Sequence, residues 1–100
     1  MSSRLEAASA GTFRLTGDIT FETVSSLASR SAAWRGPEPA TVDLSGIGAT
    51  DSSAVALLLD WVNESRASGQ VLRITGVPER LRDLVRVHGV APLLDDVVTS

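Results

Sequence analysis

Residues 46–61 read GIGATDSSAVALLLDW, and the character of the chain changes abruptly within this stretch. Its first half is rich in glycine and small polar residues, whereas its second half is almost entirely apolar. The apolar residues recur at i, i+3, i+4 and i+7, which predicts an amphipathic helix from Ser52 to about Ala67. The residues on this face are Val55, Leu58, Leu59 and Val62, and Ala54, Leu57 and Trp61 widen it. So wide an apolar stripe favours packing on more than one side of the helix.

Strand patterns lie on both sides of this helix. Alternating apolar and polar residues predict strands at 12–17 (TFRLTG), 40–45 (ATVDLS) and 70–75 (QVLRIT), and more weakly at 4–9 (RLEAAS). Gly17 is expected to end the first of these strands, and residues 46–48 are expected to form a loop before the central helix.

Two further helices are predicted, one before and one after the central helix. The first runs from a cap at Thr20 to about Trp34, and the second lies between Pro78 and Gly89. Residues 91–98 (APLLDDVV) are expected to form a short strand or a last turn.

The alternation of strands with helices indicates an α/β fold. We expect a single domain over residues 1–100, with a small mixed, mostly parallel sheet flanked by about three helices. This length suffices for one compact core. Disorder is expected only at the first few residues, which are rich in serine and alanine.

The composition excludes several classes of function. The net charge is −3, so we expect no binding to nucleic acid. All nine basic residues are arginine, which excludes a lysine-dependent phosphate loop or Schiff base, and the absence of cysteine excludes thiol chemistry and disulfides. His88 is the single histidine, and no metal site or cofactor is predicted. With no apolar segment long enough to cross a bilayer, we expect a cytoplasmic protein with no direct membrane insertion.

Four small polar residues, Thr50, Asp51, Ser52 and Ser53, gather where the central helix begins. One of them serves as an N-cap, which accounts for one side chain but not for the group. A phosphate cradle is weakly supported, because SGIGAT lacks the third glycine and the lysine of nucleotide loops. A serine hydrolase would need His88 as its base, and ATDSSAV is not a nucleophile elbow, so an enzyme is not expected. A phosphate on a serine here would meet the positive end of the helix dipole, as in a regulatory switch.

Arginine and acidic residues alternate on the predicted helix after Pro78. Arg80, Arg82 and Arg86 stand among Glu79 and Asp83. Pairing at i, i+3 and i, i+4 predicts a solvated, charge-paired face, and a basic contact for an acidic partner is the alternative.

Three segments together resemble the STAS domain family: VDLSGIGATD, the DSS at the start of an apolar helix, and LRITGVPERLRDLVRVHGVAPLL. The resemblance extends from about Gly11 to Leu94 and implies a small sheet flanked by helices. It also implies that the hydroxyl directly after the aspartate, Ser52, is the regulatory group. In anti-sigma-factor antagonists a partner kinase phosphorylates this hydroxyl, and in MlaB-like subunits it takes part in docking onto the ATPase of a phospholipid ABC transporter. Neither branch is an enzyme.

The helix AVALLLDW and the C-terminal part resemble the transporter branch more closely, whereas DSS resembles the antagonists. We therefore expect an adaptor that binds the ATPase subunit of an Mla-type transporter maintaining outer-membrane lipid asymmetry. Such an adaptor would be peripheral to the inner membrane through its partner. The alternative is an anti-sigma-factor antagonist bound by its kinase. The expected partner-binding residues are Thr50, Asp51, Ser52, Ser53, Ala54 and Trp61, and a position in the core is an equal alternative for Trp61.

Overall fold

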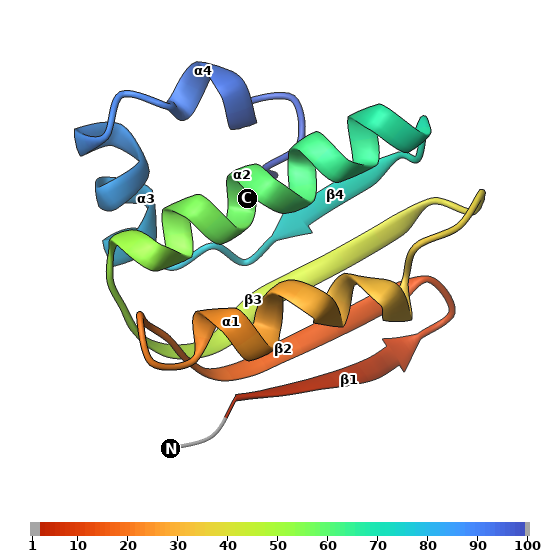
Figure 1. The fold of residues 1–100 in the computed structure, drawn as a ribbon, viewed down its shortest axis with the longest axis horizontal. Coiled ribbons are helices and arrows are strands. Elements are labelled where there is room, and N and C mark those ends of the chain that lie inside the picture. Colours follow the sequence, from red (N-terminus) through yellow and green to blue (C-terminus); the bar gives the residue numbers. More distant parts are fainter. Residues whose placement is uncertain (1–2, 100) are drawn as a thin grey trace.

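A four-stranded sheet forms the centre of the computed structural model, which describes residues 3–99. The strands β1 (Arg4–Ser9), β2 (Thr12–Ile19), β3 (Ala40–Thr50) and β4 (Leu72–Thr75) lie side by side in this order (Figure 1). β1 and β2 are antiparallel, whereas β2 with β3 and β3 with β4 are parallel. The predicted α/β fold with a mixed, mostly parallel sheet is therefore confirmed.

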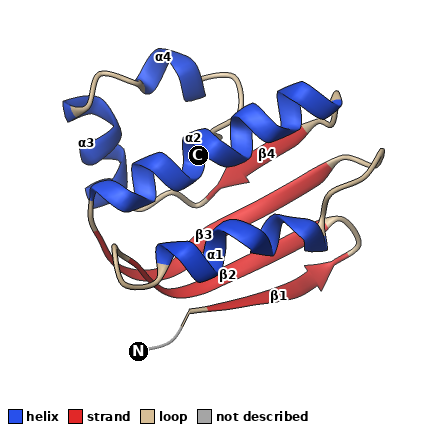
Figure 2. Ribbon diagram, in the orientation of Figure 1, coloured by secondary structure: helices blue, strands red, loops and turns tan. Residues whose placement is uncertain are grey.

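Helices pack on one face of this sheet (Figure 2). They are α1 (Val24–Ala28), α2 (Ser52–Ser68), α3 (Glu79–Val87) and α4 (Ala91–Leu94), and a 3₁₀ helix, Ser29–Ala33, continues α1. The described part thus holds one more α-helix than the three expected, because residues 91–94 close into a single turn. No helix within residues 3–99 has the length and apolar character needed to span a bilayer.

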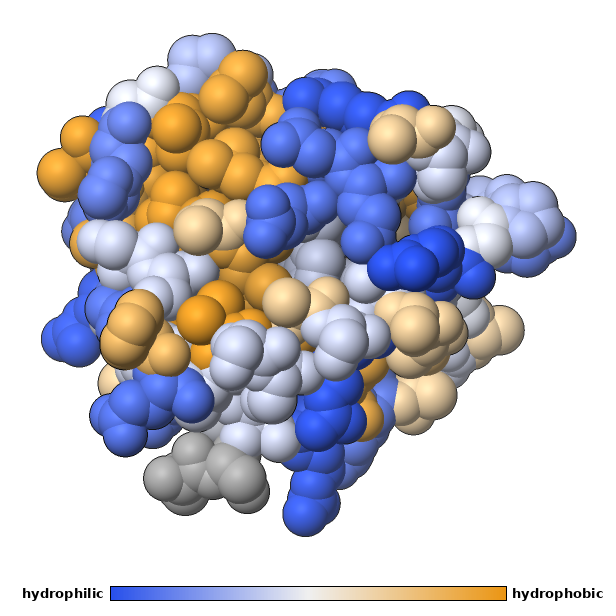
Figure 3. Space-filling view, in the orientation of Figure 1, coloured by the Kyte–Doolittle hydropathy of each residue, from blue (hydrophilic) through white to orange (hydrophobic). Residues whose placement is uncertain are grey.

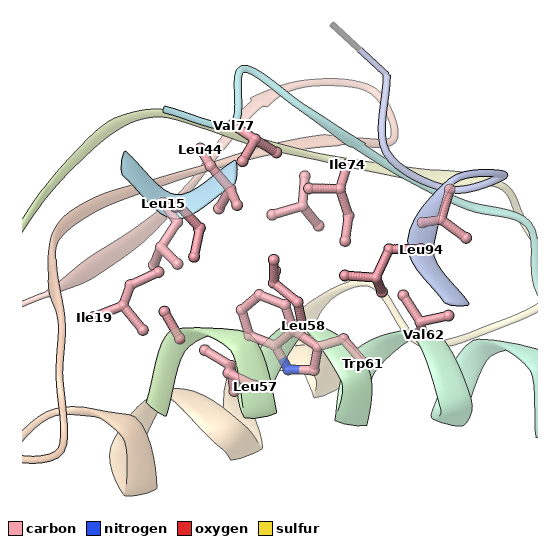
Figure 4. Packing of buried hydrophobic residues seen from close by; sticks show 14 of the residues in the cluster. Leu15, Ile19, Leu44, Leu57, Leu58, Trp61, Val62, Ile74, Val77 and Leu94 are labelled. Carbon is pink, nitrogen blue, oxygen red and sulfur yellow. The ribbon is translucent and has the colours of Figure 1, made fainter. Parts of the chain in front are cut away.

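The hydrophobic core lies between the sheet and α2. Alternate residues of β3, such as Val42 and Leu44, are fully buried, while Asp43 between them points to the uncovered face. Leu58 and Trp61 of α2 face these strand residues (Figure 4). The period of two in the strand and of 3.6 in the helix thus bring their apolar faces together. The edge of Trp61 packs on Trp34 in a T-shaped contact, with ring centroids 4.9 Å apart.

The first helix differs from its prediction at both ends. Thr20 does not cap it; instead the Thr20 amide donates to the Thr23 hydroxyl, and α1 begins only at Val24. After Ala28 the helix tightens into a 3₁₀ turn. Serines cause this departure, since their hydroxyls donate to carbonyls three residues earlier and compete with regular helical bonding.

Residues 46–48 form part of β3 and not the predicted loop. Glycine is needed because β2 approaches closely here: a Cβ on Gly46 would lie 2.9 Å from the Thr16 methyl, and one on Gly48 would lie 2.6 Å from Asp18 Oδ1. That Asp18 oxygen accepts a hydrogen bond from the Ala49 amide at 2.9 Å. The glycines that suggest a loop in the sequence therefore serve close strand packing.

The ends of two other strands were also predicted wrongly. β2 continues through Gly17 to Ile19, since the Ile19 side chain is fully buried in the core. β4 begins at Leu72 and not at Gln70, whose backbone amide donates to the Ser65 carbonyl at the end of α2 and whose side-chain Nε2 donates to the carbonyls of Trp34 and Glu38. The segment 91–98 combines both of its alternatives, a helical turn followed by a single parallel bridge between Ile74 and Val98.

Gly76 joins β4 to α3 in a left-handed conformation (φ +65°), and a Cβ there would lie 2.9 Å from the Ser45 backbone nitrogen. We expect Gly76→Ala to lower the free energy of unfolding by at least about 2 kcal/mol, through backbone strain and steric overlap together. Gly69 has a similar φ of +76° but open space around it, so Gly69→Ala should cost only about 1 kcal/mol. Urea denaturation of both variants measures the difference, and equal losses would contradict the tight contact of Gly76 with β3.

Candidate functional site

Three segments converge at the end of the sheet where β3 meets α2. These segments are the loop after β2, the junction at residues 50–53, and the C-terminal end of α3 (Figure 1). Side-chain hydrogen bonds connect the junction to the loop through Asp51 and to α3 through Ser52. The four polar residues singled out in the sequence therefore occupy a point where separate parts of the chain meet.

Asp51 caps α2 and also holds the neighbouring loop. Its backbone is extended (φ −138°, ψ −168°), and its Oδ1 accepts a hydrogen bond from the Ser53 amide at 2.8 Å. Its Oδ2 accepts from the Phe21 amide at 3.0 Å. The cap explains why the helix begins where it does, and the second bond fixes the loop after β2 beside it.

These hydrogen bonds lower the pKa of the Asp51 carboxyl below its usual value. The bond from the Phe21 amide is the largest cause, and the bonds from Ser53 act in the same direction. Desolvation opposes them by raising the pKa, but it does not prevail. Asp51 is therefore ionised at neutral pH and holds a fixed negative charge next to Ser52.

Ser52 is the first residue of α2, and its side chain is exposed. Its Oγ lies 3.0 Å from Nε2 of His88, which directly follows α3 and is also exposed. Either ring tautomer completes a hydrogen bond at this distance, with the hydroxyl donating in one case and the imidazole in the other. Ser52 does not cap α2, because Asp51 is the N-cap, so the Ser52 hydroxyl is not needed to begin the helix.

His88 is placed by the way α3 ends. Gly89 follows it in a left-handed conformation (φ +71°), and the Gly89 amide donates to the Arg86 carbonyl at 3.0 Å. The Val90 amide then donates to the Val85 carbonyl at 3.3 Å, which closes the end of the helix. The chain turns away immediately after His88, and the imidazole extends from the helix end toward Ser52.

The Ser52–His88 pair lacks other parts of a nucleophilic active site. A catalytic serine–histidine pair uses a further group to orient the imidazole, and no described side chain hydrogen-bonds to Nδ1 of His88. Neither of the two best-formed cavities within residues 3–99 is lined by Ser52 or His88. Ser52 and His88 both lie on the exposed surface.

The structure places the other predicted site residues differently. Ser53 is half-buried and gives its backbone amide to Asp51. The Thr50 hydroxyl is buried and has no hydrogen-bond partner among the described residues, so it is not presented outward. Ala54 is fully buried, so it lies in the core and not on the expected partner surface. Trp61 is only 2% exposed and lies in the core, which was the alternative for this residue. Their side chains form part of the contact between α2 and the rest of the fold.

Two residues of this region were not included among the predicted site residues. The sequence suggests His88 only as the base of a hydrolase, and its contact with Ser52 joins positions 36 residues apart. Phe21 is 81% exposed although it is large and apolar, and its amide is held by Asp51. No sequence signal singles out Phe21, because it is predicted to lie in the first turn of the helix from Thr20, whereas α1 begins only at Val24.

Arginines of α3 border an apolar area outside this junction. Figure 3 shows the area over α3 and α4, where a cavity of about 150 Å³ is lined mainly by apolar side chains. Arg82 Nε donates to the Val77 carbonyl, and Arg86 pairs with Asp83 at 3.0 Å. The bond to Asp83 agrees with the predicted charge-paired helix face. Within residues 3–99 no cluster of three or more histidine, aspartate or glutamate side chains is suited to a metal ion.

The family model described as "Mlab, STAS domain" matches residues 3–95. The chain belongs to the STAS domain family. Proteins with this domain are generally regulators or adaptors and not enzymes. The three segments that carry the resemblance, from VDLSGIGATD to LRITGVPERLRDLVRVHGVAPLL, lie inside the matched range.

Solved structures show the same fold at low sequence identity. The anti-sigma factor antagonist SpoIIAA in its unphosphorylated form is 15% identical, with a TM-score of 0.69 over 98% of this chain and 86% of that one. Phosphorylated SpoIIAA from Bacillus is also 15% identical, with a TM-score of 0.67 over 98% and 89%. A sulfate transporter family protein from Wolinella succinogenes is 15% identical, with a TM-score of 0.68 over 93% and 80%. No curated protein sequence is significantly similar to this STAS domain.

The cap of α2 can be tested through its charge. We expect Asp51→Ala to lower the free energy of unfolding by about 1–2 kcal/mol at pH 7, because both amide bonds are lost. Asp51→Asn keeps one acceptor oxygen and should fall between this variant and the wild type. Because the pKa of Asp51 is lowered by folding, its charge stabilises the protein fully above the unfolded-state pKa of about 3.9, and this contribution is lost as the pH falls through the folded value.

Urea denaturation between pH 2 and 8 measures these differences. The gap between wild type and Asp51→Asn should be constant above pH ~5 and should narrow below pH ~4. A gap that does not change with pH would show that the ionised carboxylate is not the stabilising form.

Proposed function

We propose that this STAS domain is a non-enzymatic adaptor that binds the ATPase subunit of a phospholipid ABC transporter of the Mla type. The surface that meets the ATPase is the N-terminal end of α2, with Ser52 at its centre and Asp51 and Ser53 beside it. The observation that carries this proposal is the exposed Ser52 hydroxyl, which is released from capping because Asp51 performs that role. The MlaB description of the matching family supports the choice of partner.

The geometry supports protein recognition in two further ways. Helix α2 is buried along its apolar face, whereas Ser52 at its N-terminal end is exposed to solvent. The exposed Phe21 side chain lies in the loop that Asp51 holds, and aromatic residues are enriched in the centres of protein interfaces. The Ser52 hydroxyl and the Phe21 ring are thus exposed on two segments, and the Asp51 carboxylate connects these segments by hydrogen bonds.

The ATPase would hold this adaptor at the cytoplasmic side of the inner membrane, as a peripheral subunit. The role we infer is to stabilise or regulate the ATPase in a transporter that maintains the lipid asymmetry of the outer membrane. Binding through a partner requires no membrane-spanning helix in this chain, and none occurs within residues 3–99.

The alternative is an anti-sigma-factor antagonist that a partner kinase switches by phosphorylating Ser52. The similarity of the fold to SpoIIAA, solved in both phosphorylated and unphosphorylated forms, favours this candidate. A phosphate on Ser52 would add about −1.5 to −2 charges at the helix N-terminus, where the backbone dipole tolerates them. The fold would remain intact, and the added charge would change the affinity for the partner.

A pull-down of the tagged domain from detergent-solubilised cells of its source, with mass spectrometry, tests the two candidates. Recovery of an ABC ATPase with its permease supports the adaptor. Recovery of a small soluble ATP-dependent kinase, together with phosphate on Ser52 after ATP is added, supports the antagonist and overturns the adaptor.

Variants of Ser52 test the surface itself. We expect Ser52→Ala to weaken ATPase binding about tenfold, since a buried interface hydrogen bond would be lost, and Ser52→Asp to weaken it further by placing a second carboxylate beside Asp51. Stability should change by less than about 0.5 kcal/mol in Ser52→Ala, because this residue is not the cap. Ser68→Ala, at the opposite end of α2, is the matched control and should bind normally. Unchanged affinity in well-folded Ser52→Ala and Ser52→Asp would exclude Ser52 from the interface.

A further inference from the structure

The contact between Ser52 and His88 is not required by the fold. Both side chains are exposed, so neither polar group would be left without water if the bond were absent. The residues belong to different helices and stand 36 positions apart in the chain. A hydrogen bond between two exposed side chains contributes little to the stability of the fold. Its main effect is to orient the Ser52 hydroxyl.

We propose that His88 is a positioning residue, which holds the Ser52 hydroxyl in the orientation that the partner protein recognises. This inference rests on the proposed function, because it assigns a role to His88 in the binding of the ATPase subunit. It also extends the partner surface from the start of α2 to the end of α3. The surface then depends on three segments: the loop held by Asp51, the first turn of α2, and the end of α3.

A serine side chain on a helix surface can rotate among staggered positions about its Cα–Cβ bond, and its hydroxyl hydrogen also rotates. The imidazole nitrogen at 3.0 Å favours the rotamer in which Oγ points toward α3. A partner that binds this rotamer does not have to order the side chain itself, so the bond raises affinity by preorganisation. When the Ser52 hydroxyl donates to the ring, its two lone pairs remain for the partner, and when it accepts from the ring, its hydrogen and one lone pair remain.

The position of His88 is itself fixed by the backbone. The left-handed Gly89 and the bond from the Val90 amide to the Val85 carbonyl set where α3 ends, and the imidazole leaves the helix at that point. Leu81 and Val85 bury the inner face of α3 in the core, which anchors α3 relative to α2. His88 therefore approaches Ser52 from a rigid element and not from a free loop.

The contact can be measured in the isolated domain. His88 is the only histidine, so the two imidazole nitrogens give one pair of signals in a ¹⁵N–¹H long-range NMR spectrum. We expect Ser52→Ala to shift the Nε2 signal more than the Nδ1 signal, and Ser53→Ala, the matched control, to leave both unchanged. Equal spectra of wild type and Ser52→Ala would overturn the contact without reference to any partner.

A double-mutant cycle tests the positioning role with the purified ATPase subunit. His88→Asn removes the hydrogen-bonding group from the Nε2 position and should weaken binding about three- to tenfold, the effect of one lost hydrogen bond. His88→Gln places its amide nitrogen close to the Nε2 position and should restore part of the affinity. In the Ser52→Ala background, His88→Asn should have no further effect, because a positioning residue acts through the group that it positions.

The outcomes separate the two proposals. If Ser52→Ala weakens binding but His88→Asn does not, the positioning role is wrong and the proposed function stands. If the two losses multiply in the double variant, His88 contacts the partner independently and positioning is again overturned. If the wild-type domain does not bind the ATPase subunit, the proposed function is wrong, and so is the role of His88 in binding that partner.

Discussion

Burial of α2 is the constraint on which the rest of this structure depends. The helix packs its wide apolar face against the sheet, and it contacts α1, α3 and α4 as well. Leu58 and Trp61 fill the space in front of β3, and Trp34 packs on Trp61 from the segment after α1. Since the hydrophobic contribution grows with the apolar area removed from water, this one helix organises most of the core. Elements that pack against it are thereby placed relative to one another.

The candidate site is a consequence of that burial. The apolar face of α2 is occupied by the core, whereas Ser52 at the start of the helix is exposed, and this is where the proposed partner would bind. Asp51 caps α2, so that Ser52 does not have to, and it also fixes the loop that carries Phe21 beside the start of the helix. The end of α3 comes close because α3 packs against α2, and His88 then meets the hydroxyl. The proposed partner surface thus consists of side chains from three segments.

Sequence patterns predicted the elements well where one periodicity governs a segment. The 3.6-residue period from Ser52 and the alternation around Val42 are regular; α2 forms where expected, and β3 begins where expected although it continues to Thr50. The errors occur where local residues have a second role. Gly48 suggests a loop but allows β2 to approach, and serine hydroxyls shorten the first helix through their bonds to the backbone. Trp61 continued an apolar stripe, and only packing against Trp34 decides that it lies in the core.

By itself the sequence determined the class of fold, the start of the central helix and the position of the polar cluster, because these depend on neighbours close along the chain. The family resemblance added the expectation that Ser52 is the functional hydroxyl. The tertiary structure alone decided which side chains of the cluster face solvent, and it turned Thr50 and Ala54 inward while leaving Ser52 exposed. It also decided that Ser52 meets His88. A contact between residues 36 positions apart arises from how two helices pack, and no local pattern records that geometry.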